Sequence, residues 1–171
     1  ICEAVQAKYP EIKLIGTSGP FDAGEDFELG WKSAREQNVA LVDEHYYKGA
    51  DWFLNNLHRY DSYSRTGPKV YLGEYASWGN HWHNALAEAA YLTGLERNGD
   101  VVEFAFYAPL LGRIGHTQWN PDLIYFDGKG VYPTVNYDIQ KLFSVNRGNR
   151  YFDGVITHED KENKVLASSC V

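Results

Sequence analysis

The chain has 171 residues, and its 23 acidic side chains outnumber its 16 lysines and arginines, which gives a formal net charge of −7. The length suits one domain or part of one, and a hydrophobic content of 44% is enough to bury a core. An acidic chain without a cluster of Lys and Arg is not expected to bind nucleic acid, because affinity for phosphates comes mainly from cationic side chains. Its apolar runs are far shorter than the roughly 18 residues of a membrane span, so we expect no membrane partner.

Helical and strand patterns alternate along the first 107 residues. Apolar residues at helical spacing predict helices at 3–9, 26–38, 51–63 and 82–97. Continuous apolar runs predict strands at 13–17, 39–43, 69–75 and 101–107. Successive strands begin about 30 residues apart, the length of one β/α unit. The pattern predicts an α/β fold with parallel strands covered on both faces, as in doubly wound sheets and (β/α)8 barrels.

The last third of the chain has a different pattern. A loop that contains His116 and Trp119 precedes an apolar run at 123–126, and 135–145 has the spacing of a last helix. Strand-like segments at 151–157 and 164–171 flank a charged turn at 158–163. These segments predict a β-hairpin that opens another domain.

The candidate site follows from the strand ends, because ligands of parallel α/β folds bind where the strands end. Polar or aromatic residues follow three of the predicted strands, at 43–47, 73–78 and 104–107. Glu74 fits glycoside hydrolysis best, since that reaction needs a fixed carboxylate to attack or stabilise the anomeric carbon. The position alone is also typical of a surface or ion-paired glutamate.

His45 and Tyr47 lie two positions apart on the neighbouring strand end, so their side chains point the same way. If that side faces the ligand, both can donate hydrogen bonds to Glu74 and keep it ionised. A structural role explains His45 equally well. The 13 tyrosines and 5 tryptophans suit sugar rings, which are apolar on one face, although core packing explains many of them too.

Other kinds of site have little support in the sequence. His81 and His83, together with His45, lack the ligand set and spacing of zinc enzymes. Glycine-rich phosphate loops and the Gly-Xaa-Ser-Xaa-Gly elbow are absent, which argues against nucleotide cofactors and serine hydrolases. Cys2 and Cys170, at opposite ends of the chain, form neither a disulfide framework nor a zinc pattern. We therefore expect no metal and no cofactor.

Five stretches, in this order along the chain, together resemble the α-L-arabinofuranosidases of glycoside hydrolase family 51. They are Val42-Asp43-Glu44-His45-Tyr46-Tyr47, Trp52-Phe53-Leu54-Asn55-Asn56, Tyr60-Asp61-Ser62-Tyr63, Gly67-Pro68-Lys69-Val70-Tyr71-Leu72-Gly73-Glu74-Tyr75-Ala76 and Trp119-Asn120-Pro121-Asp122-Leu123-Ile124-Tyr125-Phe126. The resemblance implies a (β/α)8 barrel followed by a β-sandwich. It also implies retaining hydrolysis of terminal α-L-arabinofuranosyl groups from arabinoxylan or arabinan.

The resemblance also implies roles for individual residues. Glu74 matches the catalytic nucleophile at the end of the seventh barrel strand, and His45 and Tyr47 match residues of the sixth strand that support it. Trp78 matches an aromatic wall of the sugar site. The segment after the eighth strand contacts substrate in the family, which suggests the same for Trp119, Asn120 and Asp122.

One feature of the family is missing from this sequence. Family members carry their acid/base glutamate in an Asn-Glu pair at the end of the fourth strand, and no Asn-Glu pair occurs here. We therefore expect 1–148 to form barrel strands five to eight and 149–171 to begin the sandwich, with the acid/base residue upstream of Ile1. A retaining site needs two carboxyl groups, so the chain by itself is expected to be inactive.

Two other functions remain open at this stage. The chain could be a non-catalytic carbohydrate-binding piece, or part of a barrel glycosidase that acts on another sugar. The expected partners are polysaccharides or oligosaccharides that contain arabinofuranose. Linkage preference and oligomeric state, including a homo-oligomer, stay open, and the resemblance favours a secreted or periplasmic enzyme.

Overall fold

The computed structural model describes residues 1–154, 156 and 166–171. The chain divides into two compact units, which we describe separately. The first unit comprises Ile1–Tyr46, Tyr63–Tyr75 and Asp100–Phe106, and the second comprises Tyr47–Ser62, Ala76–Gly99 and Tyr107–Val171. No helix among the described residues is long and apolar enough to cross a membrane.

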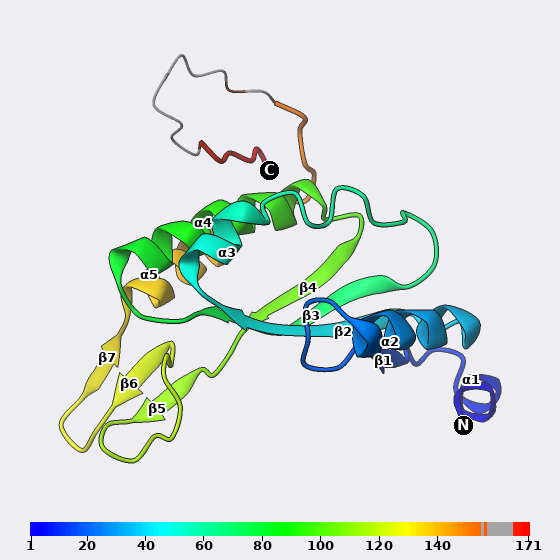
Figure 1. Ribbon diagram of the computed structural model, residues 1–171, viewed down its shortest axis with the longest axis horizontal. Coiled ribbons are helices and arrows are strands. Elements are labelled where there is room, and N and C mark those ends of the chain that lie inside the picture. Colours follow the sequence, from blue (N-terminus) through cyan, green and yellow to red (C-terminus); the bar gives the residue numbers. More distant parts are fainter. Residues whose placement is uncertain (155, 157–165) are drawn as a thin grey trace. The chain divides into compact units, whose positions relative to one another are not determined.

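The first unit contains most of a four-stranded sheet (Figure 1). Its elements are α1 (Cys2–Lys8), β1 (Ile15–Thr17), α2 (Glu25–Glu36), β2 (Leu41–Lys48), β3 (Lys69–Ser77) and β4 (Val102–Tyr107). The strands lie in the order β1-β2-β3-β4, and β1 pairs with β2 in parallel, with Ile15 opposite Leu41. This order repeats the order of the strands in the chain, as expected for successive β/α units.

Helix α2 packs closely against β1. Phe27, Trp31 and Ala34 form its buried face, at helical spacing. A Cβ atom on Gly30 would lie only 2.4 Å from the carbonyl oxygen of Thr17, so glycine permits this close approach. The acidic first turn of α2 also favours the helix, because carboxylates stabilise the positive end of the helix dipole.

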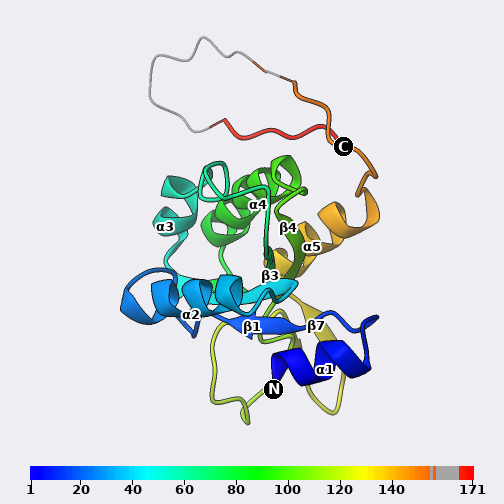
Figure 2. The ribbon, with the colours of Figure 1, turned by 90° about the vertical axis from the view of Figure 1, so that its right-hand side faces the viewer.

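The second unit combines three helices with a small sheet. Its elements are α3 (Ala50–Asn55), α4 (Trp82–Arg97), β5 (Leu111–Arg113), β6 (Ile124–Phe126), β7 (Val131–Pro133) and α5 (Val135–Val145). Helix α4 packs against both α3 and α5 (Figure 2). In the small sheet, β6 pairs in parallel with β5 and antiparallel with β7.

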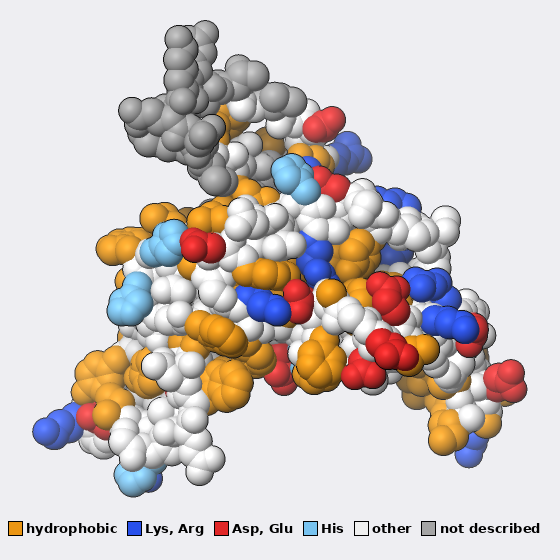
Figure 3. Space-filling view, viewed as in Figure 1, with side chains coloured by type: hydrophobic (Ala, Val, Ile, Leu, Met, Phe, Trp, Pro, Cys, Tyr) orange, Lys and Arg blue, Asp and Glu red, His pale blue; other side chains and the backbone are white. Residues whose placement is uncertain are grey.

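The structure confirms the predicted alternation of helices and strands, with two differences. The helix expected at 51–63 ends at Asn55 and continues as turns, and the small sheet at 111–133 was not predicted. The prediction of sheet faces covered on both sides is wrong for β4, in which residues 103–106 are exposed. Strand β4 is at an edge of the described sheet, so only one neighbouring strand covers it. Figure 3 shows hydrophobic side chains exposed among charged groups of both signs.

The predicted hairpin at 151–157 and 164–171 lies in part outside the described residues. Among 151–154, 156 and 166–171, none lies in a strand. One backbone hydrogen bond, from Phe152 N to Cys170 O at 2.8 Å, joins the two segments. The domain boundary at 148/149 therefore stays a prediction.

Candidate active site

In the first unit, strands β2 and β3 bring three titratable side chains together. His45 Nε2 lies 2.9 Å from Asp43 Oδ2, and His45 Nδ1 lies 3.5 Å from Glu74 Oε2. The imidazole of His45 therefore lies between two carboxylates, each of which is partly exposed. This arrangement fixes the ring and presents one of its nitrogens to Glu74.

Gly73 and Glu74 of β3 both lie close to polar side chains of β2. Buried and half-buried residues alternate along β3 until these two residues, which are both half-buried. A Cβ atom on Gly73 would lie 2.2 Å from Asp43 Oδ1, so glycine leaves room for the Asp43 carboxylate. The next residue, Glu74, contacts His45.

Asp43 is a functional candidate that sequence reasoning missed. The signal was present, because Asp43 precedes His45 by two positions and therefore shares its side of the strand. Burial raises the pKa of the Asp43 carboxyl above its ordinary value, the neighbouring His45 lowers it in part, and the Glu74 carboxylate raises it. The pKa of Asp43 thus depends on both other members of the group.

Glu44, between Asp43 and His45 in the sequence, has a different role. Its side chain is wholly buried and accepts hydrogen bonds from Trp31 Nε1 at 3.0 Å and from Tyr63 Oη at 2.9 Å. These bonds tie β2 to α2 and to the segment that precedes β3. The alternation of β2 thus assigns Glu44 to the core and its two neighbours to the opposite side.

The other predicted site residues lie in the second unit. Trp119 packs edge-on against Tyr47, with ring centroids 5.0 Å apart. Tyr47 also packs against the cluster formed by Ala76, Tyr107 and Leu123. The ring of Trp119 remains 45% exposed.

Trp78, the predicted aromatic wall, is more exposed than Trp119, at 62%. Its backbone N–H donates to the carbonyl oxygen of Lys48 at 2.8 Å, which attaches the end of β3 to the end of β2. The backbone of Trp78 is therefore held in place while its indole ring is exposed to solvent. Such a ring is available to stack on a sugar.

Asn120 and Asp122 form hydrogen bonds with residues close to them in the sequence. Asp122 is 1% exposed, accepts a hydrogen bond from Thr117 Oγ1 at 3.0 Å, and packs against Gly112, where a Cβ atom would lie 2.2 Å from its carboxylate. Asn120 Oδ1 lies 3.1 Å from Tyr125 Oη. Asp122 was predicted as a substrate contact, and its burial favours a structural role.

The described residues contain no group of three or more His, Cys, Asp or Glu side chains arranged to hold a metal ion. His83 lies 3.2 Å from Asp51, but no further ligand joins them there among the described residues. The predicted site residues thus form two sets, His45 and Glu74 in the first unit and the remaining five in the second.

Comparison with known proteins identifies the family. The family model described as "Alpha-L-arabinofuranosidase C-terminal domain" matches residues 73–166. An extracellular exo-α-L-arabinofuranosidase of Streptomyces chartreusis is 56% identical over 147 residues, which are 86% of this chain and 18% of that protein. α-L-Arabinofuranosidase 1 of Arabidopsis thaliana is 36% identical over 85% of this chain and 21% of its own length. The chain thus spans about a fifth of the length of these curated relatives.

Solved structures give a concordant match. The arabinose-bound MgGH51 α-L-arabinofuranosidase aligns with a TM-score of 0.74 and 33% identity, over 87% of this chain and 25% of that one. A family 51 enzyme from Bifidobacterium longum, at 12% identity and a TM-score of 0.65, shares the fold over 85% of this chain and 38% of its own. Because the family model covers more than half of the chain, the chain belongs to the α-L-arabinofuranosidases of glycoside hydrolase family 51.

Proposed function

We propose that this chain supplies barrel strands five to eight of a retaining α-L-arabinofuranosidase and that Glu74 is the nucleophile. The observation that carries the proposal is the contact between His45 Nδ1 and Glu74 Oε2, at 3.5 Å. A histidine that is itself held by Asp43 can hold the neighbouring carboxylate oriented for attack. Membership of the family supports hydrolysis as the reaction.

An ion pair between residues at the two edges of the sheet supports a barrel. In a flat sheet of this kind, β1 and β4 would lie about 14 Å apart, since neighbouring strands are separated by roughly 4.8 Å. Yet Lys13, just before β1, forms an ion pair with Glu103 of β4 at 3.0 Å. An ion pair between the two edges of the sheet is expected if the sheet bends toward closure.

Aromatic side chains on β3 and β4 also support the barrel. Phe104 and Phe106 stack at 5.9 Å, and Tyr71 lies 5.6 and 5.2 Å from their centroids. The two phenylalanines are still 45% and 43% exposed. Further barrel strands would cover these rings, as interior side chains fill an eight-stranded barrel. We infer that residues upstream of Ile1 in the intact enzyme provide those strands.

In the proposed reaction, the Glu74 carboxylate attacks the anomeric carbon of a terminal α-L-arabinofuranosyl group while a carboxylic acid elsewhere in the enzyme protonates the leaving oxygen. The glycosyl ester on Glu74 is then hydrolysed by water, which that second group deprotonates, and arabinose leaves with its configuration retained. The substrates are arabinan, arabinoxylan or their oligosaccharides. This chain contributes one of the two carboxyl groups, so it is inactive by itself.

The test uses the intact enzyme and an aryl α-L-arabinofuranoside. Glu74→Ala is expected to lower kcat at least about a thousandfold, because the covalent intermediate can no longer form. Azide should restore part of the rate by attacking in place of the carboxylate. Near-normal activity of Glu74→Ala would refute the assignment. Turnover by residues 1–171 alone, if it depends on Glu74, would refute the need for a second half.

A further inference from the structure

Glu88, in the second unit, carries a buried carboxylate that the proposed reaction does not use. Its side chain projects from α4 and is 0% exposed. Glu88 Oε1 accepts hydrogen bonds from the backbone N–H of Ser77 at 2.9 Å and from its hydroxyl at 2.6 Å. Glu88 Oε2 accepts from Asn136 Nδ2 at 2.9 Å. One carboxylate therefore joins the end of β3, α4 and α5.

A relay of side-chain amides leads away from this carboxylate. Asn136 Oδ1 accepts from Asn80 Nδ2 at 3.0 Å, and the same nitrogen donates to the carbonyl oxygen of Asp122 at 3.3 Å. Asn80 Oδ1 lies 3.3 Å from Tyr125 Oη, which in turn accepts from the backbone N–H of Asp122 at 3.0 Å. The relay thus reaches the loop that precedes β6.

Each end of the network lies next to a tryptophan predicted to contact the sugar, Trp78 at one end and Trp119 at the other. At one end, Ser77 is the residue directly before Trp78. At the other, Thr117 Oγ1 donates to Asp122 Oδ2 at 3.0 Å and accepts from the backbone N–H of Trp119 at 3.2 Å. A chain of hydrogen bonds therefore connects the buried carboxylate with the backbone next to Trp78 and with that of Trp119.

We propose that Glu88 is a positioning residue that orients the amides of Asn136 and Asn80 and thereby holds Trp78 and Trp119 as walls of the arabinofuranose-binding site. The proposal rests on the proposed function, because it takes these tryptophans as substrate contacts. An asparagine amide has two possible orientations, and the hydrogen-bond partners decide between them. In the bonds from Ser77 and Asn136, Glu88 only accepts, so the carboxylate fixes the orientation at the start of the relay.

Glu88→Gln tests whether the side chain at position 88 must accept hydrogen bonds and not donate them. Its oxygen can still accept from Ser77, but the new amide nitrogen faces Asn136 Nδ2, and two donors cannot bond to each other. If Asn136 turns its amide over, its nitrogen faces Asn80 Nδ2. Asn80 cannot turn over without placing its oxygen against the carbonyl oxygen of Asp122. The conflict therefore displaces the Trp119 loop.

The double variant E88Q/N136D should repair the relay. The carboxylate at position 136 then accepts both from the amide introduced at position 88 and from Asn80, so each donor again faces an acceptor, with the bond between positions 88 and 136 reversed. The buried negative charge moves from position 88 to the adjacent side chain at position 136 and is not lost. A role of Glu88 that depends only on its own charge would not be rescued in this way.

The experiment measures KM and kcat of the intact enzyme on an aryl α-L-arabinofuranoside and on an arabino-oligosaccharide. Glu88→Gln is expected to raise KM about tenfold or more and to change kcat less, because a displaced wall loses contact with the sugar. E88Q/N136D is expected to recover most of this loss. An unchanged KM in Glu88→Gln, or no recovery in the double variant, would overturn the proposal.

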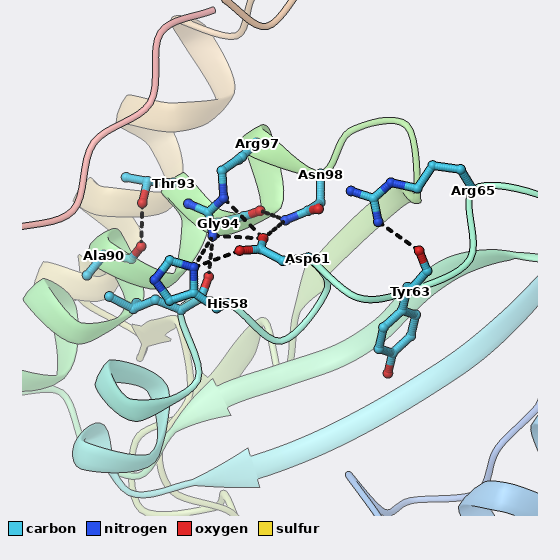
Figure 4. A network of polar contacts seen from close by, with 10 residues as sticks. His58, Asp61, Tyr63, Arg65, Ala90, Thr93, Gly94, Arg97 and Asn98 are labelled. Carbon is cyan, nitrogen blue, oxygen red and sulfur yellow. Dashed lines mark hydrogen bonds and ion pairs between the residues drawn. The ribbon is translucent and has the colours of Figure 1, made fainter. Parts of the chain in front are cut away.

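The matched control is Asp61→Asn, in a second network at the far end of α4 (Figure 4). Arg97 and Asn98 donate to Asp61 there, and Asp61→Asn should lower the melting temperature without raising KM. An equal rise in KM would contradict a specific relay. If Glu88→Gln does not fold, Tyr125→Phe removes one hydroxyl of the relay, and its unchanged KM would overturn the proposal. Activity of Glu74→Ala tests the proposed function separately.

Discussion

The carboxylates of the two units are held in contrasting surroundings. In the first unit, Asp43 and Glu74 flank His45 and all three are partly exposed. In the second unit, Glu88 is wholly buried and bonded by a serine and an asparagine. Histidine exchanges protons near neutral pH, whereas serine and asparagine do not titrate there. The first arrangement suits proton-dependent catalysis, and the second suits the fixing of positions.

The second unit itself contains two carboxylates of opposite behaviour, Glu88 within α4 and Asp61 beside the C-terminal end of that helix. Burial raises the pKa of Glu88, and the hydrogen bonds from Ser77 and Asn136 offset this only in part. At Asp61, burial also raises the pKa, but hydrogen bonds from Asn98, His58 and Arg97 outweigh it, so the pKa is lowered. Ionisation of Asp61 therefore stabilises the fold, whereas ionisation of Glu88 lowers the free energy of unfolding, although the carboxylate holds its hydrogen-bond partners in position.

After the loss expected for Glu74→Ala, the next largest effect is expected in the first unit, at Asp43. Asp43→Asn should lower kcat/KM by roughly 10- to 100-fold, the size of effect that follows loss of a partner that orients a histidine. Asp43→Ala should lower it further, because it also removes the hydrogen bond to His45. The measurement is the pH profile of kcat/KM in the intact enzyme, whose shape should change in both variants.

Glu44→Gln provides the control, since it removes a carboxylate from the same strand on the opposite side. It should lower the melting temperature through its bonds to Trp31 and Tyr63, and it should leave the shape of the pH profile unchanged. The contrast between the units would break down if Asp43→Asn kept its rate and pH profile. It would also break down if Glu44→Gln altered the profile as strongly.

A smaller effect, on stability alone, is expected at Asp61. Asp61→Asn loses charge-assisted hydrogen bonds from Arg97 and Asn98. Because the carboxylate is partly exposed, solvent screens it, and we expect a loss of only about 1 kcal/mol. Thermal melting of the intact enzyme at neutral pH measures this, with kcat/KM expected to stay within about twofold. A large loss of activity would contradict a purely structural network.

The smallest and most specific effect is a difference in sign with pH. The stabilisation by Asp61 is complete above its ordinary pKa of 3.8 and is lost as the pH falls through the lowered value. The contribution of Glu88 runs the other way, because its folded pKa is raised above 4.5. Stability falls as the pH rises from about 4.5 through the raised value. Melting temperatures are measured from below pH 3.8 to above pH 4.5 and compared with those of Asp61→Asn and Glu88→Gln. The stabilisation lost in Asp61→Asn should increase with pH, and the contribution lost in Glu88→Gln should decrease with pH. Equal slopes would contradict the opposite pKa shifts.

Much of the fold could be predicted from the sequence, where local patterns are long. The helices at Trp82–Arg97 and Val135–Val145 have the predicted bounds, because the first is rich in Ala and Leu, the second has regular apolar spacing, and an asparagine follows each. The helix predicted at 51–63 is shorter, since Asp61 and its neighbours bond to the end of α4 instead of continuing the helix. The strands β5 to β7 have three residues each, which is too short for a periodic pattern.

The candidate site was predicted in part for the same reason. His45 and Glu74 end neighbouring strands, and the structure brings them within 3.5 Å of each other. Asp43 was missed because only His45 and Tyr47 were considered on that side of the strand. The burial of Asp122 could not be predicted, because it depends on the close approach of Gly112.

The sequence by itself determined the α/β repeat, because each helix and strand has its own local pattern and the patterns recur about every 30 residues; the role of Glu74 stays a prediction. Only the tertiary structure decided which carboxylates act together. The bonds of Glu88 to Ser77 and Asn136 join positions 11 and 48 residues apart, and that of Asp61 to Arg97 spans 36. Pairings over such distances follow from how the helices and strands pack, and a local pattern does not record them.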